Sequence, residues 1–236
     1  MERALLQFRV RRLRAGLAGE PATVGEARRR PETLHELGLD ALTDHYARIV
    51  RSFDTPPVIV GHSVGGLIAQ HLLGANAGCA AVAIAPALLD HASVLAPGEP
   101  WPVSMDAGRF RRLFANAVTD QESAELFERH VVPGSRRLLT ELGHGGAVRH
   151  PRAVVDHGNT GRGPLLLISG QEDRLVPDHV TRAVYKLYGD STATSNLKQF
   201  PDRAHSLVLD SGWRAVADYV LVWLAEQGVR ADPSKW

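Results

Sequence analysis

A five-residue segment with a serine at its centre and a glycine at each end directly follows the short apolar run at Val58–Val60. The pattern is G-x-S-x-G, with Gly61, Ser63 and Gly65 at its fixed positions. In a nucleophile elbow this pattern joins a buried strand to a helix through a turn that strains the serine backbone, and small residues on either side let strand and helix approach closely. We therefore expect Ser63 to be a nucleophile at a helix N-terminus, where the amide N–H of Val64 faces a developing oxyanion.

A nucleophilic serine needs a general base and an acid that orients the base. Both residue types follow in the chain. The apolar run 164–170 predicts a second buried strand, and Asp173 lies in the loop after it. A third strand over Leu197–Phe200 leads to His205. Because functional groups of α/β sheets lie at the carboxyl ends of the strands, we expect Ser63, Asp173 and His205 to meet at one edge of the sheet.

Three segments together resemble the α/β-hydrolase superfamily, in particular its small bacterial members with a helical cap. They are Gly61–Gly66, Gly170–Pro177 and Asp202–His205, in the order that the superfamily uses. The resemblance covers most of the chain from about residue 34 onward. It implies that the serine is the nucleophile, the histidine the general base and acid, and the aspartate the carboxylate that fixes the imidazole tautomer.

The acid position has alternatives. Asp173 could instead cap the helix that follows it, and Glu172 beside it offers a second carboxylate. Asp90, which follows the apolar strand 80–85, is a further candidate because some members of the superfamily take their acid from that loop. His62 is expected to pack beside the elbow rather than act as a base, because a side chain adjacent to Ser63 in sequence points away from it.

Strands alternate with helical apolar stripes, which predicts an α/β fold: a mostly parallel sheet flanked by helices. We assign residues 34–90 and 163–236 to this core. Between them, residues 91–162 read as polar helices with short apolar stripes, the place of the helical cap in the family. Five large apolar side chains there are candidates for lining a substrate pocket, although packing between cap helices explains each equally well: Trp101, Met105, Phe110, Phe114 and Phe127.

Residues 1–33 depart from the family. They contain eight arginines, and nothing in residues 1–57 matches the strand and His-Gly loop that supply the second oxyanion amide. We expect the usual N-terminal strands to be missing or replaced. The edge of the strand at Val58–Val60 would then need a cover, either an alternating segment at Leu5–Val10 or a second copy of the chain in a homodimer.

The composition of the chain argues against several other classes of function. With 236 residues, 44% of them hydrophobic, the chain is long enough for one sizeable core. Because 27 basic residues balance 26 acidic ones, we expect no nucleic-acid partner. The single cysteine suits a reducing cytoplasm, and no stretch reaches the length of a membrane span. The motifs of metal and nucleotide sites do not occur, so we expect no metal or cofactor.

The sequence thus predicts a cytoplasmic serine hydrolase that acts on an ester, thioester or lactone of a small or medium organic substrate. Two alternatives stay open. One is a weak or inactive relative that binds ligands, because its oxyanion hole is incomplete. The other is a cofactor-free enzyme that uses the same triad for C–C bond cleavage or perhydrolysis.

Overall fold

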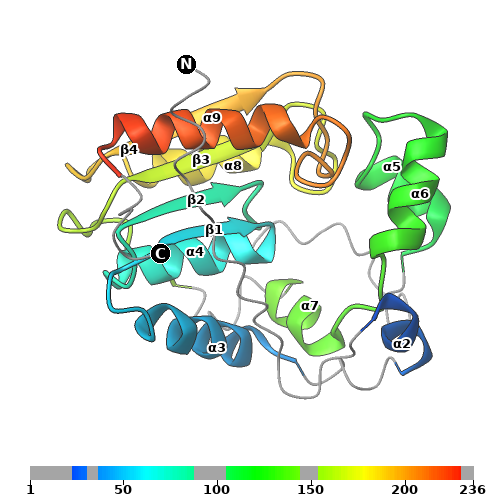
Figure 1. Cartoon of the computed structure of the whole chain (residues 1–236), viewed down its shortest axis with the longest axis horizontal. Helices are drawn as coiled ribbons and strands as arrows, with labels where there is room; N and C mark the ends of the chain where they lie inside the picture. The colour runs from blue at the N-terminus through cyan, green and yellow to red at the C-terminus, as the bar shows by residue number, and fades with distance from the viewer. Residues whose placement is uncertain (1–22, 31–36, 88–104, 144–153, 230–236) are drawn as a thin grey trace.

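The computed structural model describes residues 23–30, 37–87, 105–143 and 154–229 of the chain. Its centre is a sheet of four parallel strands in the order β1-β2-β3-β4 (Figure 1). Their bounds are β1 Val58–His62, β2 Ala80–Ile84, β3 Leu165–Gly170 and β4 Ser195–Phe200. The three strands predicted around the functional residues and the strand near residues 80–85 are therefore confirmed.

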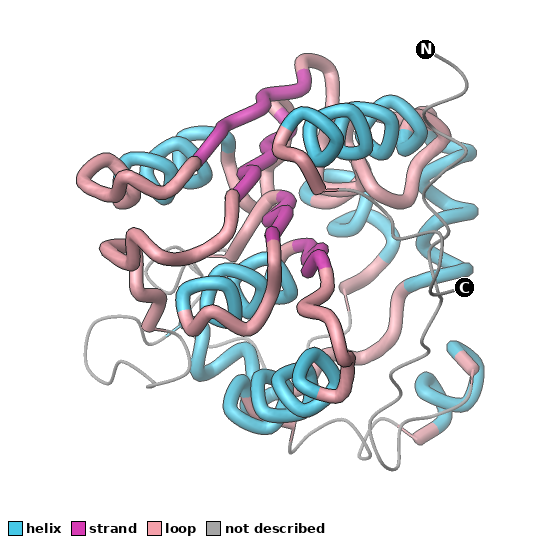
Figure 2. Tube along the Cα trace, turned by 60° about the vertical axis from the view of Figure 1, so that its left-hand side comes forward, coloured by secondary structure: helices cyan, strands magenta, loops and turns pink. Residues whose placement is uncertain are grey.

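Helices cover both faces of this sheet, as Figure 2 shows. On one face, buried residues of α3, α4 and α8 form a core with the β2 and β3 side chains that point to that face. On the other face, α9 packs against the alternate side chains of the same strands. The bounds of these helices are α3 Leu39–Arg51, α4 Val64–Gly74, α8 Asp178–Lys186 and α9 Trp213–Glu226.

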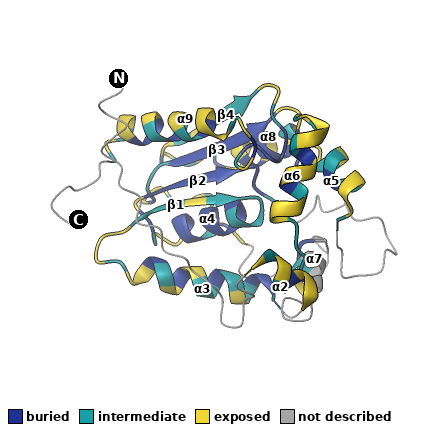
Figure 3. Ribbon diagram, turned by 45° about the vertical axis from the view of Figure 1, so that its right-hand side comes forward, coloured by how far each residue is buried: buried dark blue, intermediate teal, exposed yellow. Residues whose placement is uncertain are grey.

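The two middle strands are buried along their whole length (Figure 3). Their sequences, AAVAI and LLLISG, are continuous apolar runs because parallel strands covered on both faces have no polar side. β1 lies at the sheet edge among the described residues, and Val60 on it is 58% exposed. The described residues before β1 form two helices, α2 (Val24–Arg29) and α3, and no strand.

Helices α5 (Ala107–Leu113) and α6 (Asp120–His130) lie beside the sheet and have a small core of their own (Figure 1). This core joins Phe110, Ala115 and Leu126, separately from the two cores of the sheet. Within the predicted cap, these two helices are thus the part that packs as a unit of its own.

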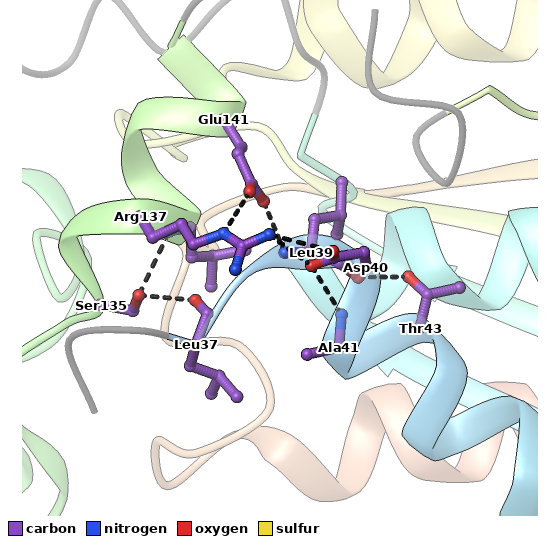
Figure 4. Close-up of polar contacts among 9 residues, drawn as sticks. Leu37, Leu39, Asp40, Ala41, Thr43, Ser135, Arg137 and Glu141 are labelled. Carbon is purple, nitrogen blue, oxygen red and sulfur yellow. Dashed lines mark hydrogen bonds and ion pairs between the residues drawn. The ribbon is translucent and has the colours of Figure 1, made fainter. Parts of the chain in front are cut away.

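Helix α7 (Arg136–Gly143) belongs instead to the main core, because Leu142 is buried against α3 and α4. Figure 4 shows how it docks on the first turn of α3. Glu141 accepts a hydrogen bond of 2.6 Å from the N–H of Leu39, and Arg137 forms an ion pair of 2.9 Å with Asp40. The N-cap of α3, Gly38, has no side chain to cap the helix, so a side chain of α7 takes this role.

Several predictions fall on residues outside the described ranges. They concern Trp101, Asp90, the segment Leu5–Val10 and most of the arginine-rich segment. Within the described residues, no helix combines the length and hydropathy needed to cross a lipid bilayer.

Candidate active site

Ser63 lies between the end of β1 and the start of α4, in a strained turn. Its φ of 55° and ψ of −118° lie in a region that costs a non-glycine residue roughly 1–3 kcal/mol. Neighbouring backbone braces it, because the N–H of Ser63 donates to the carbonyl of Ile84 at 2.9 Å and its carbonyl accepts from Ala87 at 3.0 Å. This is the geometry predicted for a nucleophile elbow. Val64 is the first residue of α4, so its N–H lies at the positive end of the helix dipole.

The glycines of the elbow have unequal roles. A Cβ on Gly61 would lie 1.9 Å from the carbonyl oxygen of Gly65, so no side chain fits there. The sequence also predicted that position 65 must be small for strand and helix to approach. This prediction was wrong, because a Cβ on Gly65 would meet nothing within 4 Å. Gly66 is the second tight position, since its Cβ would lie 3.1 Å from Pro86. Strand and helix therefore approach each other at residues 61 and 66.

Asp173 and His205 form a buried hydrogen-bonded pair. The distance from His205 Nδ1 to Asp173 Oδ2 is 2.7 Å, and both side chains are almost completely buried. The other carboxylate oxygen of Asp173 accepts two backbone hydrogen bonds of 2.8 Å, from Leu175 and Val176. One oxygen is thus left to accept the Nδ1–H of the imidazole, which leaves the lone pair on Nε2.

Backbone hydrogen bonds join the loop that carries the acid to the loop that carries the histidine. Gln171 N–H donates to the carbonyl of Phe200 at 2.9 Å, and Glu172 N–H donates to the carbonyl of Arg203 at 3.0 Å. Gly170 makes this approach feasible, because a Cβ there would lie 2.3 Å from the Arg203 oxygen. The pairing of Asp173 with His205 therefore follows from the pairing of β3 with β4.

The imidazole of His205 contacts two other rings, and these two rings also contact each other at 6.3 Å between centroids. Its centroid is 4.4 Å from that of His62 and 4.9 Å from that of Phe114, which meets it edge-on. His62 is a packing residue, as expected, and it packs against His205 and Phe114, which its position in the sequence did not indicate. That it does not act as a base stays a prediction. Burial, and then the neighbouring His205, lower the pKa of His62 to about 3, so this ring is neutral at ordinary pH.

Nε2 of His205 is buried and has no hydrogen-bond partner within the described part of the chain. Ser63 and His205 lie at the same end of the parallel sheet, since β1 and β4 run in the same direction. The structure shows no hydrogen bond between Ser63 Oγ and His205 Nε2. In enzymes without substrate, the contact between a nucleophile and its base is often long and tightens only when substrate binds. Nε2 is therefore the atom that is free to accept a proton.

The candidate pocket residues that the structure describes lie mainly inside the α5–α6 unit. Phe110 is only 2% exposed, and Met105 and Phe127 pack around it. Phe114 differs, because it touches both this unit and His205, and its carbonyl accepts a hydrogen bond of 2.9 Å from the N–H of Ser206. Among these residues, Phe114 is the one that touches a candidate catalytic side chain. The contact of all five with substrate stays a prediction.

A surface hollow lies elsewhere on the described part of the chain. It has a volume of about 460 Å³, and side chains of α6 line it together with Leu209, Asp210, Ser211 and Trp213. None of Ser63, Asp173 or His205 lines it. Within the described residues, no cluster of three or more His, Cys, Asp or Glu side chains could hold a metal ion.

Comparison with known proteins supports the same fold. The model of the alpha/beta hydrolase family matches residues 6–219, which includes most of the arginine-rich segment. No curated protein matches the chain significantly.

Solved structures of several hydrolases are similar to this chain. For the monoacylglycerol lipase of Paleococcus ferrophilus, the TM-score is 0.60 and the identity 20%, over 82% of this chain and 77% of that chain. For polyneuridine aldehyde esterase, the values are 0.56 and 15%, over 87% and 85%. For the meta-cleavage product hydrolase of Pseudomonas fluorescens, they are 0.54 and 18%, over 81% and 73%. Identities this low show a shared fold, and the family match covers most of the sequence, so the chain belongs to the α/β-hydrolase family.

Proposed function

We propose that this chain is a serine hydrolase that cleaves an ester, thioester or lactone of a small or medium organic substrate. The observation that carries the proposal is the buried 2.7 Å contact between His205 Nδ1 and Asp173, at the end of the sheet where the elbow holds Ser63. Membership of the family supports hydrolase activity, whereas a shared fold alone leaves the reaction open.

In this mechanism, Ser63 Oγ attacks the carbonyl carbon of the substrate while its proton passes to His205 Nε2. Asp173 accepts the Nδ1–H throughout and stabilises the imidazolium that forms. The N–H of Val64 faces the developing oxyanion. Collapse of the tetrahedral intermediate transfers the proton from Nε2 to the leaving alcohol or thiol, and a water molecule then releases the acid by the same steps.

The surroundings of His205 favour an organic acyl group over a highly charged substrate. Phe114 covers one side of the imidazole, and the neutral His62 lies on another. We propose that these two uncharged aromatic rings also face the acyl group of the substrate. We extend the proposal to Trp101, Met105 and Phe127 as further members of the substrate wall, whereas Phe110, buried in the α5–α6 core, would support this wall from behind.

A second candidate is a weak enzyme or a ligand-binding relative. It is favoured by the described residues before β1, which form two helices and no strand, so that they contain no strand-end loop of the kind that supplies the second oxyanion amide in the family. Loss of one such donor lowers turnover by about a hundredfold to a thousandfold. With Val64 as the one assigned donor, we expect ester turnover that is low by about this factor.

Covalent labelling separates these candidates. A fluorophosphonate should attach to Ser63 in the wild type and fail to attach in Ser63→Ala and His205→Ala, as read by mass spectrometry of the intact protein and its peptides. Ser52→Ala, at an exposed serine, is the control and should label normally. No label on the wild type would favour the binding protein. A label without turnover of chromogenic esters would direct the search to C–C bond cleavage or perhydrolysis.

The double variant Ser63→Ala/His205→Ala adds a second criterion. If the triad acts as one unit, the activity of the double variant should be little lower than that of either single variant. Losses that multiply would contradict the assignment. Asp173→Asn should fold normally and still lose most turnover, because it presents the wrong partner to Nδ1.

A further inference from the structure

Asp210 is a buried carboxylate that lies outside the triad, only 2% exposed. One of its oxygens accepts a hydrogen bond of 2.8 Å from Ser206 Oγ. The other forms an ion pair with Arg203 and accepts the N–H of Gly212 at 3.1 Å. Arg203 and Ser206 stand on the two sides of His205 in the chain. The carboxylate therefore closes the short turn that carries the imidazole.

Arg203 connects this turn to the loop of the acid. Its backbone carbonyl accepts the N–H of Glu172, the residue before Asp173, while its side chain reaches back to Asp210. A Cβ on Gly212 would lie 1.7 Å from Arg203 Nη1, so this glycine makes the space for the guanidinium. The residue before Arg203, Asp202, has a φ of 54°. The turn is thus a tight, strained conformation that needs support from side chains.

The effect of Asp210 on His205 is geometric. Its charge is paired with that of Arg203, and the carboxylate that bonds the imidazole is Asp173. A catalytic base must stay within about 1 Å of its productive position, because a larger misplacement costs about a hundredfold in rate. The ion pair holds Arg203, two residues before His205, and the hydrogen bond holds Ser206, the residue after it, so that together they limit this motion.

From these contacts, we propose that Asp210 is a positioning residue: with Arg203 and Ser206 it fixes the turn that aims the imidazole of His205. The part of this inference that concerns rate rests on the proposed hydrolase function. The part that concerns the geometry of the His205–Asp173 pair does not.

Asp210→Asn tests the inference, with Asp178→Asn as its matched control. Asp178 is likewise bonded by a serine and an arginine, at 2.6 Å to Ser169 and 2.8 Å to Arg182, and it also accepts a hydrogen bond of 2.8 Å from Gln199. It begins α8, and these partners all lie outside the histidine turn. Both variants remove one charge from a serine–arginine network. A purely structural role would make their effects alike.

Two readouts are needed. The first is the rate of fluorophosphonate labelling together with kcat and KM for an ester. The second is the low-field proton NMR signal of the hydrogen bond between His205 Nδ1 and Asp173, which requires no activity. For Asp210→Asn we expect kcat and the labelling rate to fall about a hundredfold with KM nearly unchanged, and the low-field signal to broaden or vanish. For Asp178→Asn we expect all of these to stay near the wild-type values.

Ser206→Ala gives a smaller, graded test, because it removes one of the bonds to Asp210 and leaves the ion pair. It also decides the matter if Asp210→Asn fails to fold. A wild-type labelling rate and low-field signal in folded Asp210→Asn, or in Ser206→Ala when the first variant is unfolded, would overturn the inference. If the wild type takes no label but the low-field signal still depends on Asp210, the hydrolase proposal fails and the positioning role stands.

Discussion

His62 should make the protein sensitive to acid, and the size of the effect follows from its surroundings. Burial against His205 lowers its pKa from 6.5 to about 3 in the folded state, whereas the unfolded chain keeps a value near 6.5. Between these values the unfolded state binds a proton that the folded state does not. The free energy of unfolding therefore falls as the pH drops below 6.5. Between pH 7 and pH 5 the loss amounts to about 2 kcal/mol.

The variant His62→Gln removes this ionisable group while it keeps a polar side chain of similar length. We expect urea unfolding, followed by tryptophan fluorescence at pH 7, 6 and 5, to show a drop in stability that is about 2 kcal/mol smaller in the variant than in the wild type. Each protein is compared with itself at another pH, so a general loss of stability from the substitution cancels. His130 and His157, whose pKa values burial also lowers, contribute equally to both proteins.

His130→Gln is the control, because His130 is exposed on the last turn of α6. It should change the pH dependence much less than His62→Gln does. An identical pH dependence in the wild type and in His62→Gln would refute the reasoning. It would mean that His62 takes up a proton in the folded state without penalty, and hence that the elbow is open to water.

Three further predictions concern the elbow, the cap and the sheet edge. Gly61→Ala should abolish both labelling and activity, because the new Cβ overlaps the carbonyl of Gly65. Gly65→Ala should be tolerated, because its Cβ meets no other atom. Equal losses in the two variants would count against the described elbow. Replacement of residues 105–133 by a short linker should change the preferred acyl chain and slow the labelling of Ser63 without abolishing it, because it removes Phe114 and its hydrogen bond to Ser206 but none of Ser63, Asp173 and His205. Because α5 and α6 have their own core, the rest of the chain should stay folded, and global unfolding by circular dichroism would show that they are part of the main core. The side chain of Val60 is exposed on the edge strand β1, which predicts self-association at this face. Light scattering should find a dimer, and Val60→Lys should convert it to a monomer. A monomeric wild type would contradict this prediction.

The sequence alone determined the strands and the order of the chemical groups. Continuous apolar runs mark β2 and β3 because strands buried on both faces have no polar side. The G-x-S-x-G pattern predicts the elbow because one local turn, with glycine at position 61, satisfies it. These features depend on neighbours within a few residues, and such neighbours can be recognised without knowledge of the fold.

Only the tertiary structure decided which side chains meet. It places Asp173 against His205, whereas spacing alone left the acid open, and it assigns α7 to the main core although its sequence resembles the rest of the predicted cap. It also brings Phe114 onto the imidazole and closes the histidine turn with Asp210. These contacts join residues whose distance apart in space is set by strand pairing and helix packing. No local pattern encodes that distance, so a buried carboxylate such as Asp210 looks in the sequence like any solvated one.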